Sequence, residues 1–120
     1  MQADSRVFAE RWVSEWNRKD VEAVLTHFSE DVVFASPRAQ AIVGSCRVEG
    51  KAKLREYWIG AIRRVQSIHF SLDHVISDAD RVGIVYVAEI DGRRMRAVEF
   101  LRFGADGLIY EGEAMHGVEL

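Results

Sequence analysis

The sequence predicts an α+β domain in which helices pack on one face of an antiparallel sheet. Two observations support this prediction. Apolar residues recur at helical spacing along much of the chain up to about Val65, and beyond that point they alternate with polar residues at a period of two. With 120 residues and 48% hydrophobic content, the chain is long enough for a single domain, residues 1–120, that has its own core.

The first expected helix begins at Asp4 or Ser5, either of which can cap it. Its apolar residues recur at every fourth position, at Phe8, Trp12 and Trp16. This spacing places both tryptophans on one stripe, so we expect the helix to lie against a large buried surface.

A short second helix is expected after its N-cap Asp20, with inward-facing residues Val24, Leu25 and Phe28. A brief strand, 32–35, should end at Ser36-Pro37 because proline removes a donor from the sheet. Residues 38–49 are open between strand and loop, notably at Ala41-Ile42-Val43. A third helix is expected from about Lys51 to Val65, with apolar residues Leu54, Trp58, Ala61 and Ile62 on one stripe.

The second half of the chain reads as four strands rich in Val, Ile, Phe and Tyr, around residues 67–77, 81–90, 93–103 and 108–118. Asp91-Gly92 is a strong signal for a two-residue hairpin turn, and residues 104–107 provide a four-residue turn for the next hairpin. No repeat, linker or low-complexity segment interrupts this pattern.

The two hairpins predict which residues face one another. The first turn sets Ile84 opposite Glu99, Tyr86 opposite Ala97, and Ala88 opposite Met95. The second turn sets Glu99 opposite Gly112, Ala97 opposite Ala114, and Met95 opposite His116. Small residues around Glu99 leave space between sheet and helices, as a ligand cavity requires. The alternative is that a bulky helix residue, such as Trp12 or Trp58, fills this space.

Glu99 is the most informative residue, because alternation places it on the same strand face as apolar residues. A carboxyl group in such a position is costly unless it is paired, neutralised or used. Burial would raise its pKa and could keep it protonated as a hydrogen-bond donor. The alternative is a purely structural carboxyl bonded to Tyr86, a tryptophan N–H or an arginine.

His116 is the second candidate, near the end of the last strand and on the same face. Its imidazole could act as a general base or contact a ligand; the alternative is a partly exposed histidine at the pocket rim. The candidate ligand-binding residues are Trp12, Trp16, Phe34, Trp58, Tyr86, Ala97, Gly112 and Ala114. No metal-ligand cluster or nucleotide-binding motif is present in the sequence, so neither a metal nor a cofactor is expected.

The opposite face of the sheet mixes charged residues with more apolar ones than an ordinary solvated face would carry. The charged residues include Glu89, Arg94, Arg96, Arg102, Glu111 and Glu113, and the apolar ones are Val85, Val87, Val98, Phe100 and Met115. Both sets suit a subunit interface, so a homodimer through this face is expected.

Composition narrows the possible partners and the cellular location of the protein. The net charge of -3, without a long basic run, gives little support for nucleic-acid binding. With Cys46 as the one cysteine, an intrachain disulfide is impossible and a reducing compartment is favoured. The first residues lack a signal pattern and no apolar stretch reaches membrane-spanning length. A soluble, cytoplasmic protein without membrane partners is therefore expected.

Five segments together resemble the NTF2-like superfamily, and more narrowly its SnoaL-like and ketosteroid-isomerase-like members. They are Trp12–Asp20, Phe34–Pro37, Gly50–Trp58, Val98–Phe103 and Gly112–Gly117. The resemblance covers nearly the whole chain. It implies a cone-shaped fold in which three N-terminal helices pack on a curved antiparallel sheet, with a pocket between them, commonly in homodimers.

The match to the isomerase site is incomplete. Glu99 matches the acid that donates a hydrogen bond to the substrate oxygen, but Trp12 replaces its partner tyrosine and Ser36 replaces the general-base aspartate. A serine has no accessible base near neutral pH, and an indole is a weaker acid than a phenol. Steroid isomerisation by the family mechanism is therefore not expected.

Three functions remain open. The first is a small-molecule-binding protein with an apolar pocket for a ligand of one or two rings, anchored by Glu99. The second is an enzyme of enol or proton-transfer chemistry, such as a cyclase, dehydratase or isomerase, that uses Glu99 as acid and His116 as base. The third is a non-catalytic dimerising accessory domain with a vestigial pocket filled by tryptophans.

Overall fold

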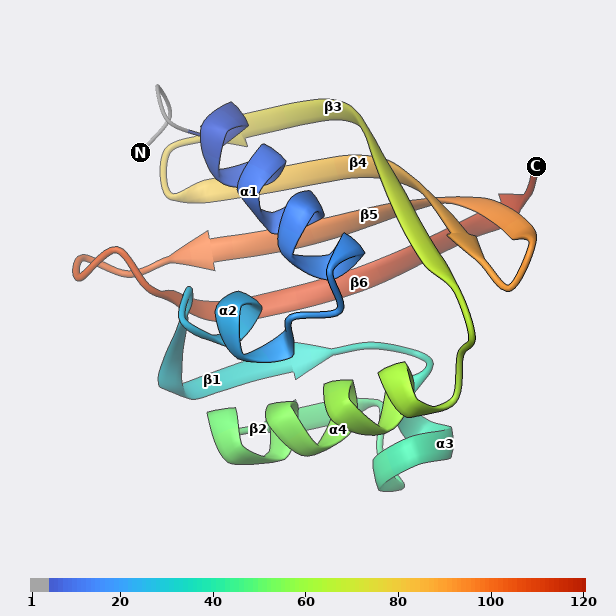
Figure 1. The fold of residues 1–120 in the computed structure, drawn as a ribbon. Helices are drawn as coiled ribbons and strands as arrows, with labels where there is room; N and C mark the ends of the chain where they lie inside the picture. The colour runs from blue at the N-terminus through green and yellow to red at the C-terminus, as the bar shows by residue number, and fades with distance from the viewer. Residues whose placement is uncertain (1–4) are drawn as a thin grey trace.

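The computed structural model describes residues 5–120, and helices and strands alternate in its first half before four long strands complete the chain (Figure 1). In chain order the elements are α1 (Ser5–Asn17), α2 (Val21–Leu25), β1 (Phe28–Ala35), α3 (Ala39–Val43), β2 (Arg47–Glu49), α4 (Lys51–Arg63), β3 (Ile68–Asp78), β4 (Arg81–Ile90), β5 (Arg93–Phe103) and β6 (Ile109–Glu119). The predicted α+β class is confirmed.

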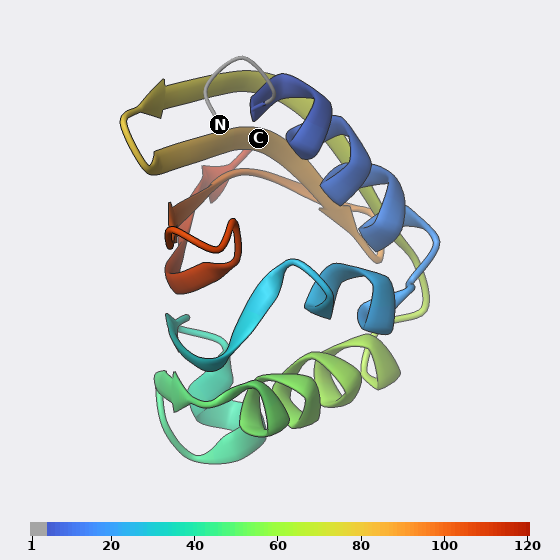
Figure 2. The same cartoon turned by 90° about the vertical axis from the view of Figure 1, so that its left-hand side faces the viewer.

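One curved sheet of six strands holds the fold together, in the order β2-β1-β6-β5-β4-β3. β1 and β6 are parallel, and every other neighbouring pair is antiparallel. Figure 2 shows the sheet curling around an interior, with α1 along β3 and α4 beside β1 and β2. The helices therefore cover the concave side of the sheet, and its convex side stays open.

The first two helices form where the sequence pattern places them. In α1, Trp12 and Trp16 are buried on the predicted stripe. The Asp20 side chain caps α2 by accepting a hydrogen bond from the backbone N–H of Ala23 at 3.1 Å, as predicted. The suggested cap Asp4 lies outside the described residues, and Ser5 is the first residue of α1.

The prediction for residues 38–49 is wrong in one respect: this segment contains a helix where strand or loop was expected. Ala41-Ile42-Val43 belongs to α3, which follows the turn after Pro37 and ends at Gly44 in the left-handed region, with φ of 84°. A short apolar run does not distinguish a strand from a buried helical turn. The chain then forms the edge strand β2, which pairs with β1.

Two other boundaries differ from the prediction. Phe28 begins β1 instead of ending the second helix, although it is fully buried as expected. α4 ends at Arg63 instead of Val65. Both shifts fall at element ends, where capping and tertiary pairing decide the last residues.

The hairpin between β4 and β5 confirms the predicted turn and register. Asp91 and Gly92 both have positive φ, 51° and 84°, as a two-residue turn between twisted strands requires. The observed pairs include Ile84 with Glu99, Tyr86 with Ala97, and Ala88 with Met95. The Asp91 carboxylate also accepts the backbone N–H groups of residues 66 and 67, which ties the turn to β3.

The predicted register between β5 and β6 is wrong by two residues from Ala97 to Arg102, and by three at Met95, which lies opposite Glu119 instead of His116. Glu99 lies opposite Ala114 instead of Gly112, and Ala97 lies opposite His116. The loop has five residues instead of four, because Phe103 pairs with Ile109, and this accounts for one residue of the two-residue shift. The second residue comes from an irregularity between Arg102 and Phe103. Since side chains alternate with a period of two, the shift changes the partners and preserves the faces.

The convex face carries the mixture of charged and apolar residues expected from the sequence. Phe100 and Met115 are 36% and 44% exposed there, near ion pairs such as Arg102 with Glu111 at 3.3 Å. In the described part of the chain, none of the helices has the length and apolar character needed to cross a membrane.

Candidate functional site

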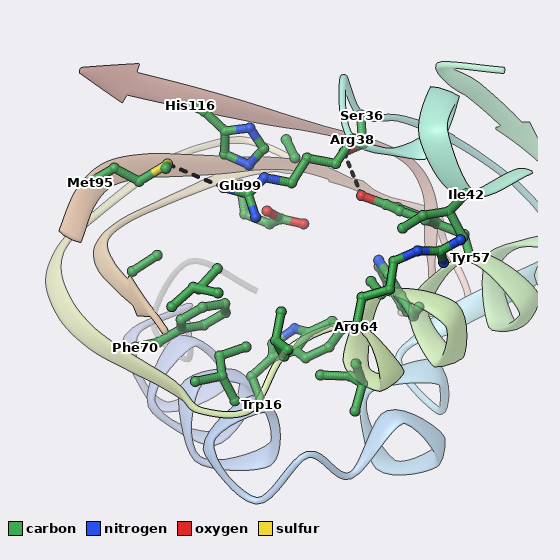
Figure 3. Close-up of a pocket in the computed structure, with 18 of the residues that line it drawn as sticks. Trp16, Ser36, Arg38, Ile42, Tyr57, Arg64, Phe70, Met95, Glu99 and His116 are labelled. Atoms are coloured by element: carbon green, nitrogen blue, oxygen red, sulfur yellow. Dashed lines mark hydrogen bonds between the residues drawn. The ribbon is translucent and has the colours of Figure 1, made fainter. Parts of the chain in front are cut away.

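A cavity of about 320 Å³ lies between the concave side of the sheet and the helices (Figure 3). It is lined on the sheet side by Phe34, Ser36, Ile68, Phe70, Tyr86, Ala88, Ile90, Met95, Glu99, Ala114 and His116. Helices and the segments next to them contribute Trp12, Trp16, Arg38, Ala41, Ile42, Tyr57, Trp58, Ala61, Ile62, Arg64 and Val65. The space is apolar over most of its wall and polar around Glu99.

Glu99 projects into this cavity from the middle of β5. Its side chain is buried, and the Tyr86 hydroxyl donates a hydrogen bond to Glu99 Oε1 at 3.3 Å. Burial raises the pKa of Glu99 to about 8, although the bond from Tyr86 lowers it somewhat. The carboxyl is therefore mostly protonated at neutral pH and can donate a hydrogen bond into the cavity.

Two tyrosines and a serine extend the polar region on either side of Glu99. Tyr86 is buried, and its pKa is raised well above its ordinary value by burial and by Glu99. Tyr57, from α4, shares a hydrogen bond of 2.8 Å with the hydroxyl of Ser36 at the end of β1. Burial raises the pKa of Tyr57 as well. All three groups are thus neutral hydrogen-bonding hydroxyls, and none is a base near pH 7.

Arg38 and His116 stand at the mouth of the cavity, beside Glu99 (Figure 3). Arg38 follows Pro37 and directs its guanidinium across the opening, where Nη2 lies 3.6 Å from Met95 Sδ. Burial, together with the charge of Arg38, lowers the pKa of His116. The imidazole is therefore mainly neutral at pH 7 and can accept a proton.

The opposite wall is aromatic. Trp12 stacks on Phe70 with ring centroids 5.7 Å apart, and Trp16 meets Trp58 edge-on at 5.2 Å. The indole N–H groups of Trp12 and Trp16 are buried without a hydrogen-bond partner in the described structure. Figure 3 shows Trp16 and Phe70 across the cavity from Glu99 and His116. A planar ligand could therefore touch aromatic rings on one side and hydrogen-bonding groups on the other.

The structure brings most of the predicted site residues together around this space. They are Glu99, His116, Trp12, Trp16, Phe34, Trp58, Tyr86 and Ala114. Ala97 and Gly112 do not line it. The sequence predicted that Gly112 leaves space for a ligand. Instead, packing in the core requires the glycine, because a Cβ there would lie 2.8 Å from Phe34 Cδ1. This glycine admits a core phenylalanine instead of leaving room for a ligand.

Besides Ser36, three lining residues that the sequence did not single out as site candidates carry polar groups: Tyr57, Arg38 and Arg64. Tyr57 follows Leu54 by three positions and precedes Trp58, so the helical stripe could have included it. Arg38 and Arg64 had no such signal: one follows a proline in a segment without a clear period, and the other caps the end of α4. Only the folded chain places these cations at the cavity.

Among residues 5–120, no group of three or more His, Cys, Asp or Glu side chains is arranged to hold a metal ion. Cys46, Ser36 and the outer-face Glu111 and Glu113 lie outside any such group. The functional groups that the cavity lining itself offers are the carboxyl, hydroxyl, imidazole and guanidinium groups described above.

Comparison with known families and structures gives consistent results. The model of the SnoaL-like domain family matches residues 9–112. A search of curated proteins gave no match. A SnoaL-like protein of unknown function from Burkholderia thailandensis is 30% identical, with a TM-score of 0.87 over 98% of each chain.

More distant structures share the fold. A proposed ketosteroid isomerase from Kribbella flavida is 18% identical, with a TM-score of 0.74 over 97% of this chain and 79% of its own. The epoxide hydrolase/cyclase-like enzyme SalBIII, which has a role in pyran ring formation in the polyether salinomycin, is 20% identical, with a TM-score of 0.74 over 98% and 93% of the two chains. NTF2-like proteins of unknown function align as well.

Proposed function

The chain belongs to the SnoaL-like domain family of the NTF2-like superfamily, and we propose that it binds a small ring-containing molecule in the cavity. In this proposal the protonated carboxyl of Glu99 donates a hydrogen bond to an oxygen atom of the ligand. One observation carries the proposal: a buried carboxyl with its pKa raised to about 8 faces an apolar cavity of about 320 Å³. Ligand sites commonly combine an apolar wall with a few such polar groups.

A purely structural role would account for Glu99 less well. Within residues 5–120, its hydrogen-bond partner is Tyr86, at the long distance of 3.3 Å, and no arginine or indole N–H bonds to it. Burying a carboxyl group costs free energy that one long hydrogen bond offsets only in part. A ligand oxygen would give the second bond, and the volume suits one or two rings.

The test uses 2-acetylnaphthalene, a carbonyl compound that is uncharged at every working pH, and isothermal titration calorimetry. Wild type and Glu99→Gln should bind it with similar affinity at pH 6, because both side chains donate. Glu99→Leu should bind about tenfold more weakly, as expected for one lost hydrogen bond. From pH 6 to pH 9 the affinity of wild type should fall as Glu99 ionises, while that of Glu99→Gln stays constant.

Glu113→Gln provides the control, because Glu113 is exposed on the other face of the neighbouring strand. It should behave as wild type at each pH. Circular dichroism must show that each variant is folded. Absence of saturable binding by wild type, or equal affinity in wild type and Glu99→Leu, would overturn the proposal.

A second candidate function is catalysis of enol chemistry, with Glu99 as acid and His116 as base. Its support is that both groups line one cavity from adjacent strands, and that His116 has a lowered pKa. In this scheme His116 removes the proton next to a ketone, while Glu99 protonates the carbonyl oxygen to form the enol. The reverse transfers restore the ketone.

Hydrogen exchange separates catalysis from binding alone. In D₂O at pD 7, wild type should speed the incorporation of deuterium beside the carbonyl of 2-tetralone, followed by proton NMR. His116→Gln should abolish the acceleration and keep the affinity for the ketone. A rate equal to that of buffer, with binding intact, leaves the protein as a binding module.

The dimerising accessory domain receives less support. A vestigial pocket would be filled by the tryptophans, whereas Trp12, Trp16 and Trp58 form the wall of a space that persists between them and Glu99. The predicted homodimer does not depend on whether the pocket is vestigial.

A further inference from the structure

We propose that the ligand is an acid: its ring system carries an oxyanion, such as a carboxylate or an acidic enolate, that pairs with the guanidinium of Arg38 beside His116. The rings then lie against Trp16 and Phe70. This inference depends on the proposed binding function and adds the charge of the ligand to it. It starts from Arg38, which neither the sequence pattern nor the family comparison singled out.

The guanidinium of Arg38 has no carboxylate partner in the part of the chain that the structure describes. Within residues 5–120 it forms no ion pair, and its one side-chain hydrogen-bond contact is the weak acceptor Met95 Sδ at 3.6 Å. Other arginines nearby in the sequence do have carboxylate partners, such as Arg47 with Glu49 at 3.3 Å and Arg55 with Glu22 at 2.9 Å. Figure 3 shows the side chain of Arg38, an exposed residue, reaching over the cavity toward Glu99 and His116.

The other groups around the cavity do not supply the missing negative charge. Among residues 5–120, Glu99 is the one carboxyl of the lining, and it forms no ion pair with Arg38. Its raised pKa and the lowered pKa of His116 keep both groups mainly uncharged at pH 7. Arg64, whose Nη1 donates to the carbonyl of Gly60 at 3.2 Å, adds a second guanidinium to the lining. The lining therefore carries an excess of positive charge.

The shape of the site indicates what kind of anion would balance this charge. A guanidinium binds the planar oxygen pair of a carboxylate with two parallel hydrogen bonds, and such pairs strengthen where water is partly excluded. The neighbouring neutral imidazole and protonated carboxyl can each donate one more hydrogen bond to an oxyanion. A small inorganic anion would use these groups and leave the aromatic wall uncovered. An aromatic or polycyclic acid would use both.

The test compares 2-naphthoate with 2-naphthamide, which has the same ring system and no charge. Isothermal titration calorimetry at pH 7 would measure both affinities in wild type, Arg38→Gln and Arg47→Gln. Wild type should bind the acid at least tenfold more tightly than the amide. Arg38→Gln should lose this preference and bind the two with similar affinity, while Arg47→Gln should keep the preference because its side chain is on the exposed edge strand β2.

Two further variants, Arg38→Lys and Arg64→Gln, make the experiment decisive. Arg38→Lys should keep part of the preference, since it retains the charge but not the two-pronged geometry, and it serves if Arg38→Gln does not fold. A preference lost in Arg64→Gln and kept in Arg38→Gln would overturn the assignment to Arg38. Equal binding of acid and amide by wild type would overturn the inference and leave the binding function standing, whereas no binding of either probe or of 2-acetylnaphthalene would overturn both.

Discussion

Glu99 and Glu113 lie on neighbouring strands, and they show what the two faces of one sheet do to the same side chain. Glu99 faces the cavity from β5, is 4% exposed, and has its pKa raised to about 8. Glu113, on β6 opposite Phe100, is exposed on the convex face. A step of one residue therefore separates a buried carboxyl that can donate a hydrogen bond into the cavity from a glutamate side chain exposed to solvent.

Other charged side chains of the convex face are exposed to solvent, as Glu113 is. Arg94 lies 4.0 Å from Glu89, and Arg96 lies 3.5 Å from Asp73, with all four side chains about half exposed. Exposed pairs like these contribute little to stability because water and salt screen them. The energetic differences in this sheet should therefore concentrate on the concave face, and substitutions on each face can test this.

The largest effect is expected from Glu99→Gln at alkaline pH. With its folded-state pKa near 8, Glu99 keeps its proton in the native state while the unfolded chain releases it above about pH 4.5. Wild type should therefore lose stability as pH rises from 5 to 8, up to about 4 kcal/mol from this group. Glu99→Gln should remove that loss, as measured by urea unfolding at pH 5.5, 7 and 8.5.

The matched control for this experiment is Glu113→Gln, which should leave the pH dependence of wild type unchanged. Parallel stability curves for wild type and Glu99→Gln across this pH range would show that Glu99 ionises normally in the folded protein.

Two glycines offer the next test, one on each face of the sheet. Gly112→Ala should destabilise by about 1–3 kcal/mol because its Cβ would meet Phe34 at 2.8 Å inside the packed core. Gly83→Ala should change stability by less than about 1 kcal/mol, since the nearest atom to its Cβ is 3.7 Å away. Thermal and urea unfolding would measure both, and equal costs would argue against tight packing at Gly112.

Tyr86→Phe should have a smaller effect, a loss of about 1 kcal/mol from one buried hydrogen bond. Because the Tyr86 hydroxyl lowers the pKa of Glu99, its removal should raise that pKa above its value of about 8. The ¹³C shift of the Glu99 carboxyl, followed by NMR titration, would measure the change. Tyr110→Phe is the control on an exposed ring, and a pKa that falls in Tyr86→Phe would contradict the assigned bond.

The smallest effect on folding is expected from Met115→Lys on the convex face, within about 0.5 kcal/mol for an exposed side chain. Its consequence should be on assembly, because the sequence predicts a homodimer through this face and Met115 is 44% exposed there. Sedimentation should show a dimer for wild type and a monomer for Met115→Lys. Val7→Lys, on an exposed position of α1, should stay dimeric, and a monomeric wild type would refute the prediction.

The fold was predictable where local patterns have one physical solution. The stripe of Trp12 and Trp16 predicts a buried helix face, and Asp91-Gly92 admits one common hairpin turn, so the pairing of Glu99 with Ile84 followed directly. The β5–β6 register failed because an added loop residue and an irregularity leave no mark in the alternation. Since the two errors added up to one full side-chain period, the prediction still placed Glu99 and His116 on the correct face.

The candidate site was predictable on its sheet side and less so elsewhere. A single acid on an apolar strand face is visible in a sequence, as Glu99 was. Arg38 gave no comparable signal, because its position depends on the turn after Pro37 and on α3, a helix too short to show a period. Cavity residues from irregular segments are set by long-range packing, which no window of sequence reports.

All three tryptophans of the protein line the cavity, and Trp16 meets Trp58 at 5.2 Å. The tryptophan part of the near-ultraviolet signal therefore originates from this one place. Indoles this close couple their electronic transitions, so the circular dichroism near 290 nm should report their mutual orientation, and their fluorescence should respond to any ring that enters. The protein thus carries a built-in optical reporter of occupancy, with which a library of compounds can be screened without labels.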